Sequence, residues 1–553
     1  MQAEWWRHAV IYQVYPRSFA DSNGDGIGDI AGITARLDHL VDLGVDAVWV
    51  SPFFASPQRD GGYDVSDYCD VDPVFGTLAN ADELIRTAHS KDLRVIFDLV
   101  PNHSSSEHPW FREALRSAPG SPARGRYIFR DGRGELGELP PNNWQSVFGG
   151  PMWTRVVEPD GTPGQWYLHI FDSCQPDFDW TNPDVHELFR DVLRFWLDRG
   201  VDGFRVDVAH GLMKQPGLPD ITAPDAHRPL PVTGMADVGM ETASQVPFWG
   251  QDTVHGIYRD WRQLVDSYPG ERILVAEAWV DPIARLADWV RPDEMHQAFN
   301  FAYLETPWAA GELKQVIDTS LTTFGSVGAP STWVLSNHDV VRHSTRLALT
   351  FHNPQGHGIG PATKNLPEPA AALQRARAAT ALMLALPGSS YLYQGEELGL
   401  PEAIDIPDHA RQDPTWLRTN GERYGREGCR VPLPWTADGE TYGFNQAAES
   451  WLPQPSHWSD LARDKQRDDE DSTLTLYRSL LALRRQLRLG IGQLQWLDRA
   501  REDVLVFRNG QVVVVANTGP EPLRLPNSEI LLASSPLLEE LTLPGDTTVW
   551  LRA

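Results

Sequence analysis

The sequence predicts an α/β protein, a (β/α)8 TIM barrel with an excursion domain after its third strand and a C-terminal antiparallel β domain. Three observations predict this architecture. Eight short apolar runs recur along most of the chain, amphipathic helical patterns separate them, and β-rich hairpin sequence follows near the C-terminus. Strands and helices that alternate in this way close most readily into a parallel barrel ringed by helices.

The eight apolar runs are the candidate strands of the barrel. Each is short and mostly apolar, as expected for buried strands. They span residues 9–15, 47–50, 94–100, 203–209, 273–279, 296–303, 332–335 and 390–394.

One of the intervening helices has clear signals at both ends. Asn182 supplies an N-cap, Pro183 occupies the first helical position, and Gly200 ends the helix before the next strand. The apolar residues between these signals lie on one helical face, at Val185, Leu188, Phe189, Val192, Leu193 and Trp196.

Two irregular stretches and a terminal change of pattern set the domain organisation. We predict a barrel formed by residues 1–102 and 175–471, an excursion domain at 103–174, and an irregular insertion at 400–455 after the eighth strand. Residues 472–553 form the C-terminal β domain, with a helix at 474–487 and a hairpin at Asn509-Gly510.

The composition limits the partners and the compartment. The formal charge is −27, which disfavours nucleic acid and anionic lipid surfaces. No apolar stretch approaches the roughly 18 residues of a membrane span. Cys69, Cys174 and Cys429 are far apart and form no disulfide or zinc pattern, so we expect a cytoplasmic protein without an organic cofactor. The sequence does not indicate an oligomeric state.

Polar and charged residues gather where the predicted strands end, and the carboxyl ends of parallel strands meet at one mouth of a barrel. Any one of these carboxylates could be a buried ion-pair partner or a helix cap. Three of the carboxylates end the fourth, fifth and seventh predicted strands, and with an arginine and two histidines beside them they point to chemistry instead. The residues concerned are Asp98, Asn102, His103, Arg205, Asp207, Glu277, His338 and Asp339.

Asp207 and Glu277 end adjacent strands, so they can face each other across a small gap. Two carboxyl groups held about 5 to 5.5 Å apart suit glycoside cleavage with retention, one as nucleophile and the other as acid and then base. Arg205 lies two residues before Asp207 and points to the same side, where its charge would keep Asp207 ionised. Glu277 needs a raised pKa. Asp339 would stabilise positive charge on the sugar.

Several motifs in this order resemble the α-amylase family, glycoside hydrolase family 13. They are DLVPNH, QPDFDW, GFRVDVAH, VAEAW, SNHD and GSSYLYQGEELG, and together they span nearly the whole chain. The resemblance implies Asp207 as nucleophile, Glu277 as acid/base and Asp339 as transition-state stabiliser. It also implies that His103 and His338 hold hydroxyls of the first glucose.

Within that family the segments AVIYQVYPRSFADSNGDGIGD and REGCRVPLPW are similar to oligosaccharide-active α-glucosidases. In such relatives an aspartate and an arginine close the pocket around a terminal 4-hydroxyl. Asp60 and Arg426 match them, although relatives often carry Asp where this chain has Glu427. The alternative for Asp60 is a loop cap. Tyr63 would stack beneath the sugar ring.

Two aromatic residues occupy positions at which relatives place aromatic side chains around the pocket entrance. They are Phe148 and Phe171, for which packing in the core of the excursion domain is the alternative. Val208, after the predicted nucleophile, resembles the oligo-1,6-glucosidase branch, whereas the following Ala209-His210 resembles broad α-glucosidases. The sequence therefore leaves the linkage open among small maltose, isomaltose and sucrose-type substrates.

The expected activity is exo-acting α-glucoside hydrolysis with transglucosylation as a side reaction. A dedicated transglucosylase or sucrose isomerase on the same fold is the nearest alternative, because a glucosyl-enzyme can pass its sugar to an alcohol. A non-catalytic sugar-binding relative is an alternative of another class, although such proteins lose catalytic carboxylates.

A Gly-rich acidic loop is the candidate metal site. Oxygen-bearing residues alternate along it, with glycines that permit a tight wrap, as in loops that bind hard cations. We predict a structural Ca²⁺, or Mg²⁺, with an acidic turn that holds no ion as the alternative. The ligands would be Asp21, Asn23, Asp25, Asp29 and the carbonyl of Ile27.

Overall fold

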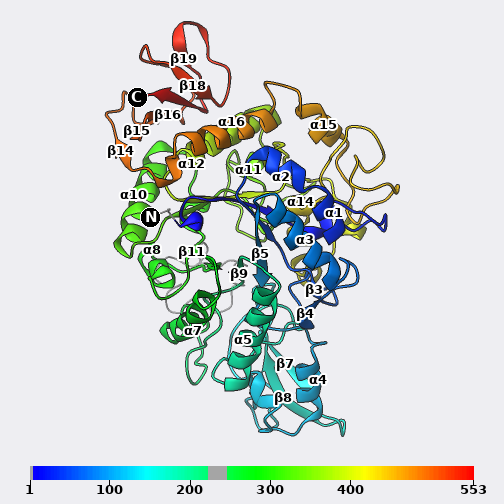
Figure 1. Ribbon diagram of the computed structural model, residues 1–553. Coiled ribbons are helices and arrows are strands. Elements are labelled where there is room, and N and C mark those ends of the chain that lie inside the picture. Colours follow the sequence, from blue (N-terminus) through cyan, green and yellow to red (C-terminus); the bar gives the residue numbers. More distant parts are fainter. Residues whose placement is uncertain (1–3, 222–245) are drawn as a thin grey trace.

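The computed structural model describes residues 4–221 and 246–553. Its centre is a sheet of eight parallel strands, and each of the eight predicted runs overlaps one of them (Figure 1). Chain order runs around the sheet, and one further parallel bridge, between Phe299 and Thr332, joins its two edge strands. The predicted barrel is confirmed. Its strands are β1 (Val10–Val14), β2 (Ala47–Val50), β5 (Arg94–Leu99), β9 (Gly203–Val206), β10 (Ile273–Ala276), β11 (Gln297–Ala298), β12 (Thr332–Val334) and β13 (Ser389–Tyr393).

The sixth predicted strand, 296–303, is mostly wrong. Only Gln297–Ala298 is strand, and a short helix, α9 (Phe301–Glu305), begins three residues later. The side chain of Asn300 accepts a hydrogen bond from the backbone N–H of Tyr303, at 3.1 Å, and so caps this helix. An apolar run cannot reveal by itself where strand gives way to helix.

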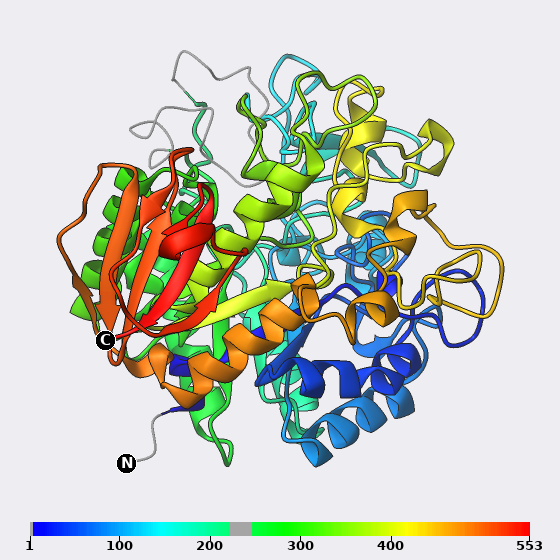
Figure 2. The same cartoon turned by 90° about the horizontal axis from the view of Figure 1, so that it is seen from above.

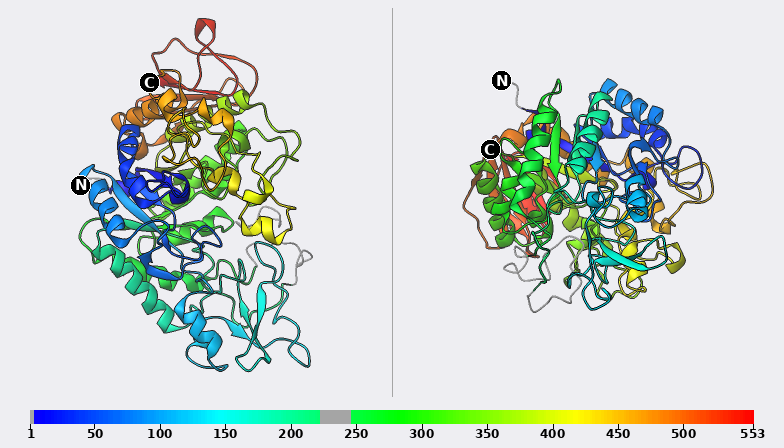
Figure 3. Two further views of the ribbon diagram at one scale, coloured as in Figure 1. Left: turned by 90° about the vertical axis from the view of Figure 1, so that its right-hand side faces the viewer. Right: turned by 90° about the horizontal axis from the view of Figure 1, so that it is seen from below.

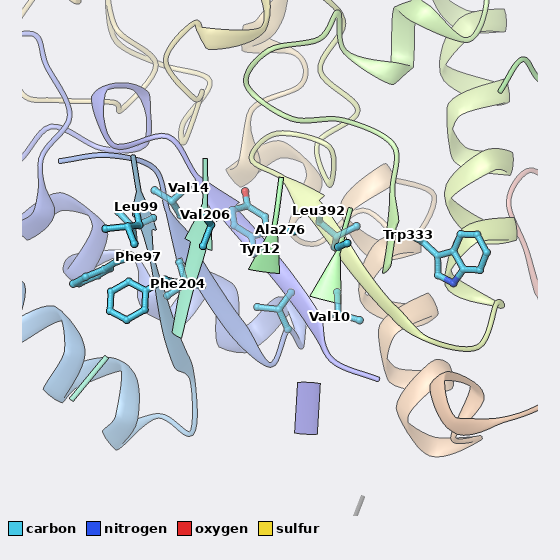
Figure 4. Close-up of a cluster of buried hydrophobic side chains, with 14 of the residues drawn as sticks. Val10, Tyr12, Val14, Phe97, Leu99, Phe204, Val206, Ala276, Trp333 and Leu392 are labelled. Carbon is cyan, nitrogen blue, oxygen red and sulfur yellow. The ribbon is translucent and has the colours of Figure 1, made fainter. Parts of the chain in front are cut away.

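Residues alternate between the two faces of the barrel wall. Alternate residues of β1 point outward and join the core beneath the helices. This core contains Val10, Tyr12 and Val14 together with Phe97, Leu99, Phe204 and Val206 of the neighbouring strands (Figure 4). Ile11 points inward and belongs to a separate cluster with Trp49, Ile96, Ile273 and Val275. Trp5 and Trp6 belong to this inner cluster, so the barrel is filled by side chains rather than hollow.

Helices cover the outside of the barrel, and α5 (Pro183–Asp198) matches its prediction closely. The side chain of Asn182 accepts a hydrogen bond from Asp184, Pro183 is the first helical residue, and Gly200 adopts a φ of 103° just beyond the end. The other main helices are α1 (Ile30–Ala35), α2 (Leu37–Leu43), α3 (Leu78–Ser90), α7 (His255–Asp266), α10 (Ala310–Ser326), α12 (Pro369–Leu384) and α16 (Thr473–Gln486).

Two antiparallel sheets lie at opposite ends of the molecule (Figures 1 and 3). The first, between β5 and α5, contains β6 (Phe129–Arg130), β7 (Trp153–Val157) and β8 (Pro163–Leu168). The second follows α16, and its strands β15 (Val504–Asn509) and β16 (Val512–Asn517) form the predicted hairpin. The predicted stretch after β13 contains the short helices α13 (Pro414–Arg418) and α14 (Glu427–Arg430). Among the described residues no helix has the length and hydropathy needed to cross a membrane.

Candidate active site

The carboxyl ends of the barrel strands surround one cavity, and most of the predicted site residues line it. Among the predicted catalytic and substrate-binding residues only Arg205 and His338 are outside the lining, and each is hydrogen-bonded to a residue that belongs to it. The lining consists of Asp60, Tyr63, His103, Phe148, Phe171, Asp207, Val208, His210, Trp249, Glu277, Asp339 and Arg426.

Arg205 is the centre of the catalytic carboxylates. As the strand register predicts, it lies on the same side as Asp207, and its Nη1 donates to Asp207 Oδ1 at 2.6 Å. The same nitrogen donates to Asp98 Oδ1 at 2.9 Å, and Nη2 lies 3.5 Å from Glu277 Oε2. One buried guanidinium therefore serves three buried carboxyl groups.

This imbalance of charge controls protonation. Burial raises the pKa of Glu277, as predicted, and Arg205 opposes the rise. Burial also raises the pKa of Asp207 well above its ordinary value, because the neighbouring carboxylates add to it and Arg205 offsets only part. The expectation that Arg205 alone keeps Asp207 ionised is therefore too simple. Both pKa values are raised, and two interacting carboxyl groups titrate in steps that belong to the pair rather than to either residue.

The backbone after Asp207 directs a hydrogen bond at Glu277. The N–H of Val208 donates to Glu277 Oε2 at 2.6 Å, and Trp279 Nε1 donates to Oε1 at 2.7 Å. Val208 has a φ of +46°, a strained conformation for a β-branched residue. Gly211 lies close by, where a Cβ would be 2.6 Å from the ring of Trp249. Both oxygens of Glu277 are thus fixed in direction.

Tyr63 and His338 form a stacked pair beside the cavity. Their ring centroids are 5.2 Å apart and nearly parallel, and the Tyr63 hydroxyl lies 2.6 Å from His338 Nε2. That hydroxyl also donates to Asp98 Oδ2, at 3.2 Å. Burial lowers the pKa of His338 well below its ordinary value, so its ring is neutral at pH 7. The Tyr63 ring lines the cavity but is stacked on a histidine.

Arg426 closes the other end of the cavity. Its Nη2 donates to Asp60 Oδ1 at 2.7 Å, its Nη1 to Asp339 Oδ1 at 3.0 Å, and its Nε to Asp413 Oδ2 at 2.6 Å. The predicted contact between Asp60 and Arg426 is present. Arg430, four residues further along, adds a second guanidinium, with Nη2 2.8 Å from Asp339 Oδ1.

Protonation at this end differs from that at the catalytic pair. Burial would raise the pKa of Asp339, but the positive groups around it, including Arg426 and Arg430, hold the pKa well below its ordinary value. Burial is opposed at Asp413 too, where the same two guanidinium groups lower the pKa. At Asp60 burial prevails over both arginines and raises the pKa. Asp339 is therefore a permanent anion.

His103, Phe148 and Phe171 form one wall of the cavity. His103 Nε2 lies 3.1 Å from the carbonyl of Tyr63, and burial lowers the His103 pKa to about 4. Phe148 and Phe171 lie 5.6 Å apart, and the Arg426 guanidinium is 5.2 Å from the centroid of Phe148. The two phenylalanines also belong to a buried apolar cluster, so the two interpretations of them hold together.

The sequence interpretation left several site residues unassigned. Gln175 donates to Asp60 Oδ2 at 3.0 Å and lies 3.2 Å from His103. Asp413 precedes Pro414, the signature of a helix N-cap, and it does cap α13. The spacing of Arg426 and Arg430, one helical turn, was a usable signal for Arg430. No such signal in the sequence pointed to Trp249, whose ring centroid lies 4.4 Å from that of His210.

A buried lysine close to the site joins the two segments that flank the excursion. Lys214 Nζ lies 2.8 Å from Asp177 Oδ2 and donates to Asn102 Oδ1 at 2.9 Å and to the carbonyl of Gly211 at 2.6 Å. Asn102 follows β5, whereas Asp177 lies between the excursion sheet and α5. The ammonium therefore connects segments that are distant in the sequence.

The acidic loop lies against the segment around Asn445, whose side chain donates to Asp21 Oδ2 at 2.8 Å. In Figure 2 the dark blue chain of this region runs beside the gold segment. The carboxylate oxygens of the loop accept hydrogen bonds from its own backbone. Asp21 accepts from Gly24 and Gly26, Asp25 from Ile27, and Asp29 from Ser22. Within residues 4–221 and 246–553 no group of three or more His, Cys, Asp or Glu side chains is arranged to hold a metal ion. The donor types suit a hard cation, and the predicted ion stays a prediction.

Comparisons with known sequences agree on a family. The family model for the alpha amylase catalytic domain matches residues 13–490. The chain is 38% identical over 511 residues to a probable alpha-glucosidase of Rhizobium meliloti strain 1021, over 90% of this chain and 85% of that protein. It is 34% identical over 524 residues to an oligo-1,6-glucosidase of Parageobacillus thermoglucosidasius, over 88% of this chain and 84% of that protein.

Solved structures are similar over the full length. An alpha-glucosyl transfer enzyme superposes with a TM-score of 0.85 at 37% identity, covering 100% of this chain and 99% of that one. A trehalulose synthase from Pseudomonas mesoacidophila MX-45 superposes with a TM-score of 0.81 at 29% identity, covering 100% of both chains. The chain therefore belongs to the α-amylase family, glycoside hydrolase family 13, and is an enzyme that acts on α-glucosides.

Proposed function

We propose that the protein is a retaining, exo-acting α-glucosidase that removes terminal glucose from short α-glucosides, with transglucosylation as a side reaction. One observation carries the proposal. A single cavity is lined on one side by two carboxyl groups with raised pKa values, Asp207 and Glu277, and has a charged end closed by Arg426 with Asp60.

The reaction proceeds in two displacements. The Asp207 carboxylate attacks the anomeric carbon while Glu277 gives its proton to the departing oxygen, so one C–O bond forms as another breaks. The glucosyl ester on Asp207 is then attacked by water, whose proton Glu277 takes back. Asp339, held ionised by Arg426 and Arg430, stabilises the positive charge that develops on the sugar.

The closed end supports exo action. Asp60 and Arg426 are both buried and hydrogen-bonded to each other, and a terminal hydroxyl can bond to both. A chain that continued past this hydroxyl would have to separate the pair and leave the Asp60 carboxylate buried without its guanidinium partner. Because such groups are costly to leave unpaired, the pair favours a chain end over an internal unit.

A dedicated transglucosylase or sucrose isomerase is the second candidate. The names of two similar structures, an alpha-glucosyl transfer enzyme and a trehalulose synthase, favour it. The linkage stays open among α-1,4, α-1,6 and sucrose-type substrates, since Val208 and His210 line the cavity without selecting one. The set of catalytic carboxylates is intact, which argues against a non-catalytic sugar-binding role.

Product analysis by NMR tests the proposal directly. Maltose, isomaltose, sucrose and an end-blocked maltooligosaccharide are each mixed with enzyme, and the first product is observed before mutarotation. We expect α-glucose, a preference among the free-ended substrates, and a resistant blocked chain. β-Glucose as the first product would reject retention, rapid cutting of the blocked chain would reject exo action, and predominant transfer products would favour the second candidate.

We also propose a structural Ca²⁺ or Mg²⁺ in the loop of Asp21 to Asp29 and a cytoplasmic location. The three cysteines are free, which supports a reducing compartment. Binding of the ion would raise the melting temperature, and the rise would grow with the logarithm of the free ion concentration above the Kd. Thermal unfolding of enzyme treated with a chelator and then refilled with Ca²⁺ tests this, with Asp25→Ala as the insensitive variant. Equal melting temperatures in all samples would reject the ion.

A further inference from the structure

A second cavity lies at the opposite end of the barrel from the catalytic mouth. It has a volume of about 460 Å³, within the range of small-molecule sites, and shares no residue with the catalytic cavity. It is formed where β1, β2 and β5 begin and where α16 ends. The lining consists of Trp5, His8, Val10, Gly44, Asp46, Arg94, Leu481, Arg484, Arg485, Arg488, Gly490 and Ile491.

Positive charge exceeds negative charge in this lining, although the protein as a whole carries −27. Four arginines line the cavity with one carboxylate, Asp46. That carboxylate is already occupied, because Oδ1 accepts from Arg485 Nη2 at 2.7 Å and Oδ2 from the N–H of Val10 at 2.8 Å. Outside the lining, Glu271 approaches through a hydrogen bond from the N–H of Trp5. Three guanidinium groups are left without a carboxylate of their own.

The most buried of these arginines is a fixed part of the wall. Arg484 is 3% exposed and donates to the carbonyls of Leu384 and Leu386, both at 2.7 Å, while its Nε has no hydrogen-bond partner among the described residues. Gly490 allows this packing, since a Cβ there would be 3.0 Å from Arg484 Nη2 and 2.7 Å from the Cβ of His8. The positive charge of Arg484 is thus built into the cavity.

The other two are available to a ligand. Arg94 lies over the ring of Trp5, 4.6 Å from its centroid, which orients the guanidinium without neutralising it. Arg488 is exposed, and its side chain makes no hydrogen bond or ion pair with the described part of the chain. Burial lowers the pKa of His8, with Arg484 and Arg488 contributing, so this histidine is neutral at pH 7 and can accept or donate one hydrogen bond.

We propose that this cavity binds a small phosphorylated anion between Arg94, Arg484 and Arg488. A phosphoryl group carries close to two negative charges at neutral pH and three acceptor oxygens, and guanidinium groups match it with paired hydrogen bonds. The enclosure fits a small molecule and is too limited for a nucleic acid duplex. The site is independent of the proposed glucosidase activity.

Calorimetric titration of the full-length enzyme at low ionic strength tests the proposal. The probes are inorganic phosphate, pyrophosphate and glucose 6-phosphate, which present one phosphoryl group, two linked groups, and one group on a sugar. We expect saturable binding of at least one probe, unchanged by saturating glucose and weakened by salt. The tightest probe identifies the source of the phosphoryl group.

Three variants make the test specific. Arg488→Gln removes an exposed side chain that makes no bond, so folding is preserved, and it should weaken binding about tenfold, the loss of one charge-assisted hydrogen bond. Arg94→Gln/Arg488→Gln should abolish measurable binding. Arg130→Gln, an exposed arginine in the excursion sheet, should leave it unchanged. No saturable binding of any probe, or equal binding by the double variant and the native enzyme, would overturn the proposal.

Discussion

The two ends of the catalytic cavity are built alike and behave differently. Each has a buried arginine surrounded by three carboxylates. Around Arg205 these are Asp98, Asp207 and Glu277, and around Arg426 they are Asp60, Asp339 and Asp413. The difference is Arg430, a second guanidinium that only the Arg426 end possesses. The pKa of Asp339 is lowered, whereas the pKa values of Asp207 and Glu277 are raised.

Counting cations against carboxylates explains this contrast. With one guanidinium for three carboxyl groups, the Arg205 end keeps a proton, which a retaining mechanism needs on its acid at the start. With two guanidinium groups for three carboxylates, the Arg426 end has a permanent anion at Asp339, which suits the stabilisation of positive charge. The same residue types therefore provide an acid at one end and an electrostatic anchor at the other.

The largest expected effect comes from replacing the catalytic carboxyl groups at the Arg205 end of the cavity. Asp207→Ala and Glu277→Gln should each lower kcat with maltose by a factor on the order of 10⁴ or more, because each deletes a group that acts in bond breaking. Circular dichroism should show both variants folded. Appreciable hydrolysis by Asp207→Ala would reject it as the nucleophile.

Azide separates the two roles. Added to Glu277→Ala with p-nitrophenyl α-glucoside, azide should attack the glucosyl ester and give α-glucosyl azide. Added to Asp207→Ala, it should replace the missing nucleophile and give the β anomer. The reverse assignment of anomers, read by NMR, would exchange the roles of the two residues.

The next effect concerns the anchoring end. Arg426→Met leaves three carboxylates with Arg430 alone, and breaking a buried pair costs about 3–5 kcal/mol. We expect a lower free energy of unfolding in urea and a loss of the discrimination against end-blocked maltooligosaccharides. Arg199→Met, which breaks an exposed ion pair with Asp82, is the control and should cost under about 1 kcal/mol. Matching losses in the two variants would contradict the buried network.

Lys214 is a third buried cation, and it has one carboxylate partner, Asp177. It tests whether a buried carboxylate here depends on its neighbouring cation. Lys214→Met leaves Asp177 buried without its ammonium and should cost about 3 kcal/mol in urea unfolding. The double variant Lys214→Met/Asp177→Asn removes the stranded charge and should recover part of the loss. A double variant less stable than the single variant would show that Asp177 is stabilised by other partners.

The sequence could predict the catalytic end better than the anchoring end, for a physical reason. Two neighbouring barrel strands carry the catalytic end, with Arg205 in β9, Asp207 directly after it and Glu277 directly after β10. Strand register alone places these residues together. Asp413 and Arg430 come from irregular segments after β13, where no periodicity fixes direction. Gln175 lay within a motif but only the folded excursion shows that it reaches Asp60. The predicted strand at 296–303 was mostly wrong because the side chain of Asn300 caps a helix there, and the hydrophobic pattern does not reveal such a cap.

The smallest expected effect is a shift in pH dependence, and it tests the charge count directly. Asp98, whose pKa burial raises to about 6, is mostly ionised at pH 7 and adds to the raised pKa of Asp207. Asp98→Asn removes that negative charge and leaves more of Arg205 to the pair, so both apparent pKa values of the pair should fall. The alkaline limb of kcat/KM, which reports loss of the last shared proton, should move to lower pH by up to about one unit. Asp202→Asn, just before the neighbouring strand β9 begins and so at the opposite end of the barrel from the catalytic mouth, should leave the profile in place. A shift to higher pH in Asp98→Asn would mean that Asp98 acts chiefly by orienting Arg205 rather than through its charge.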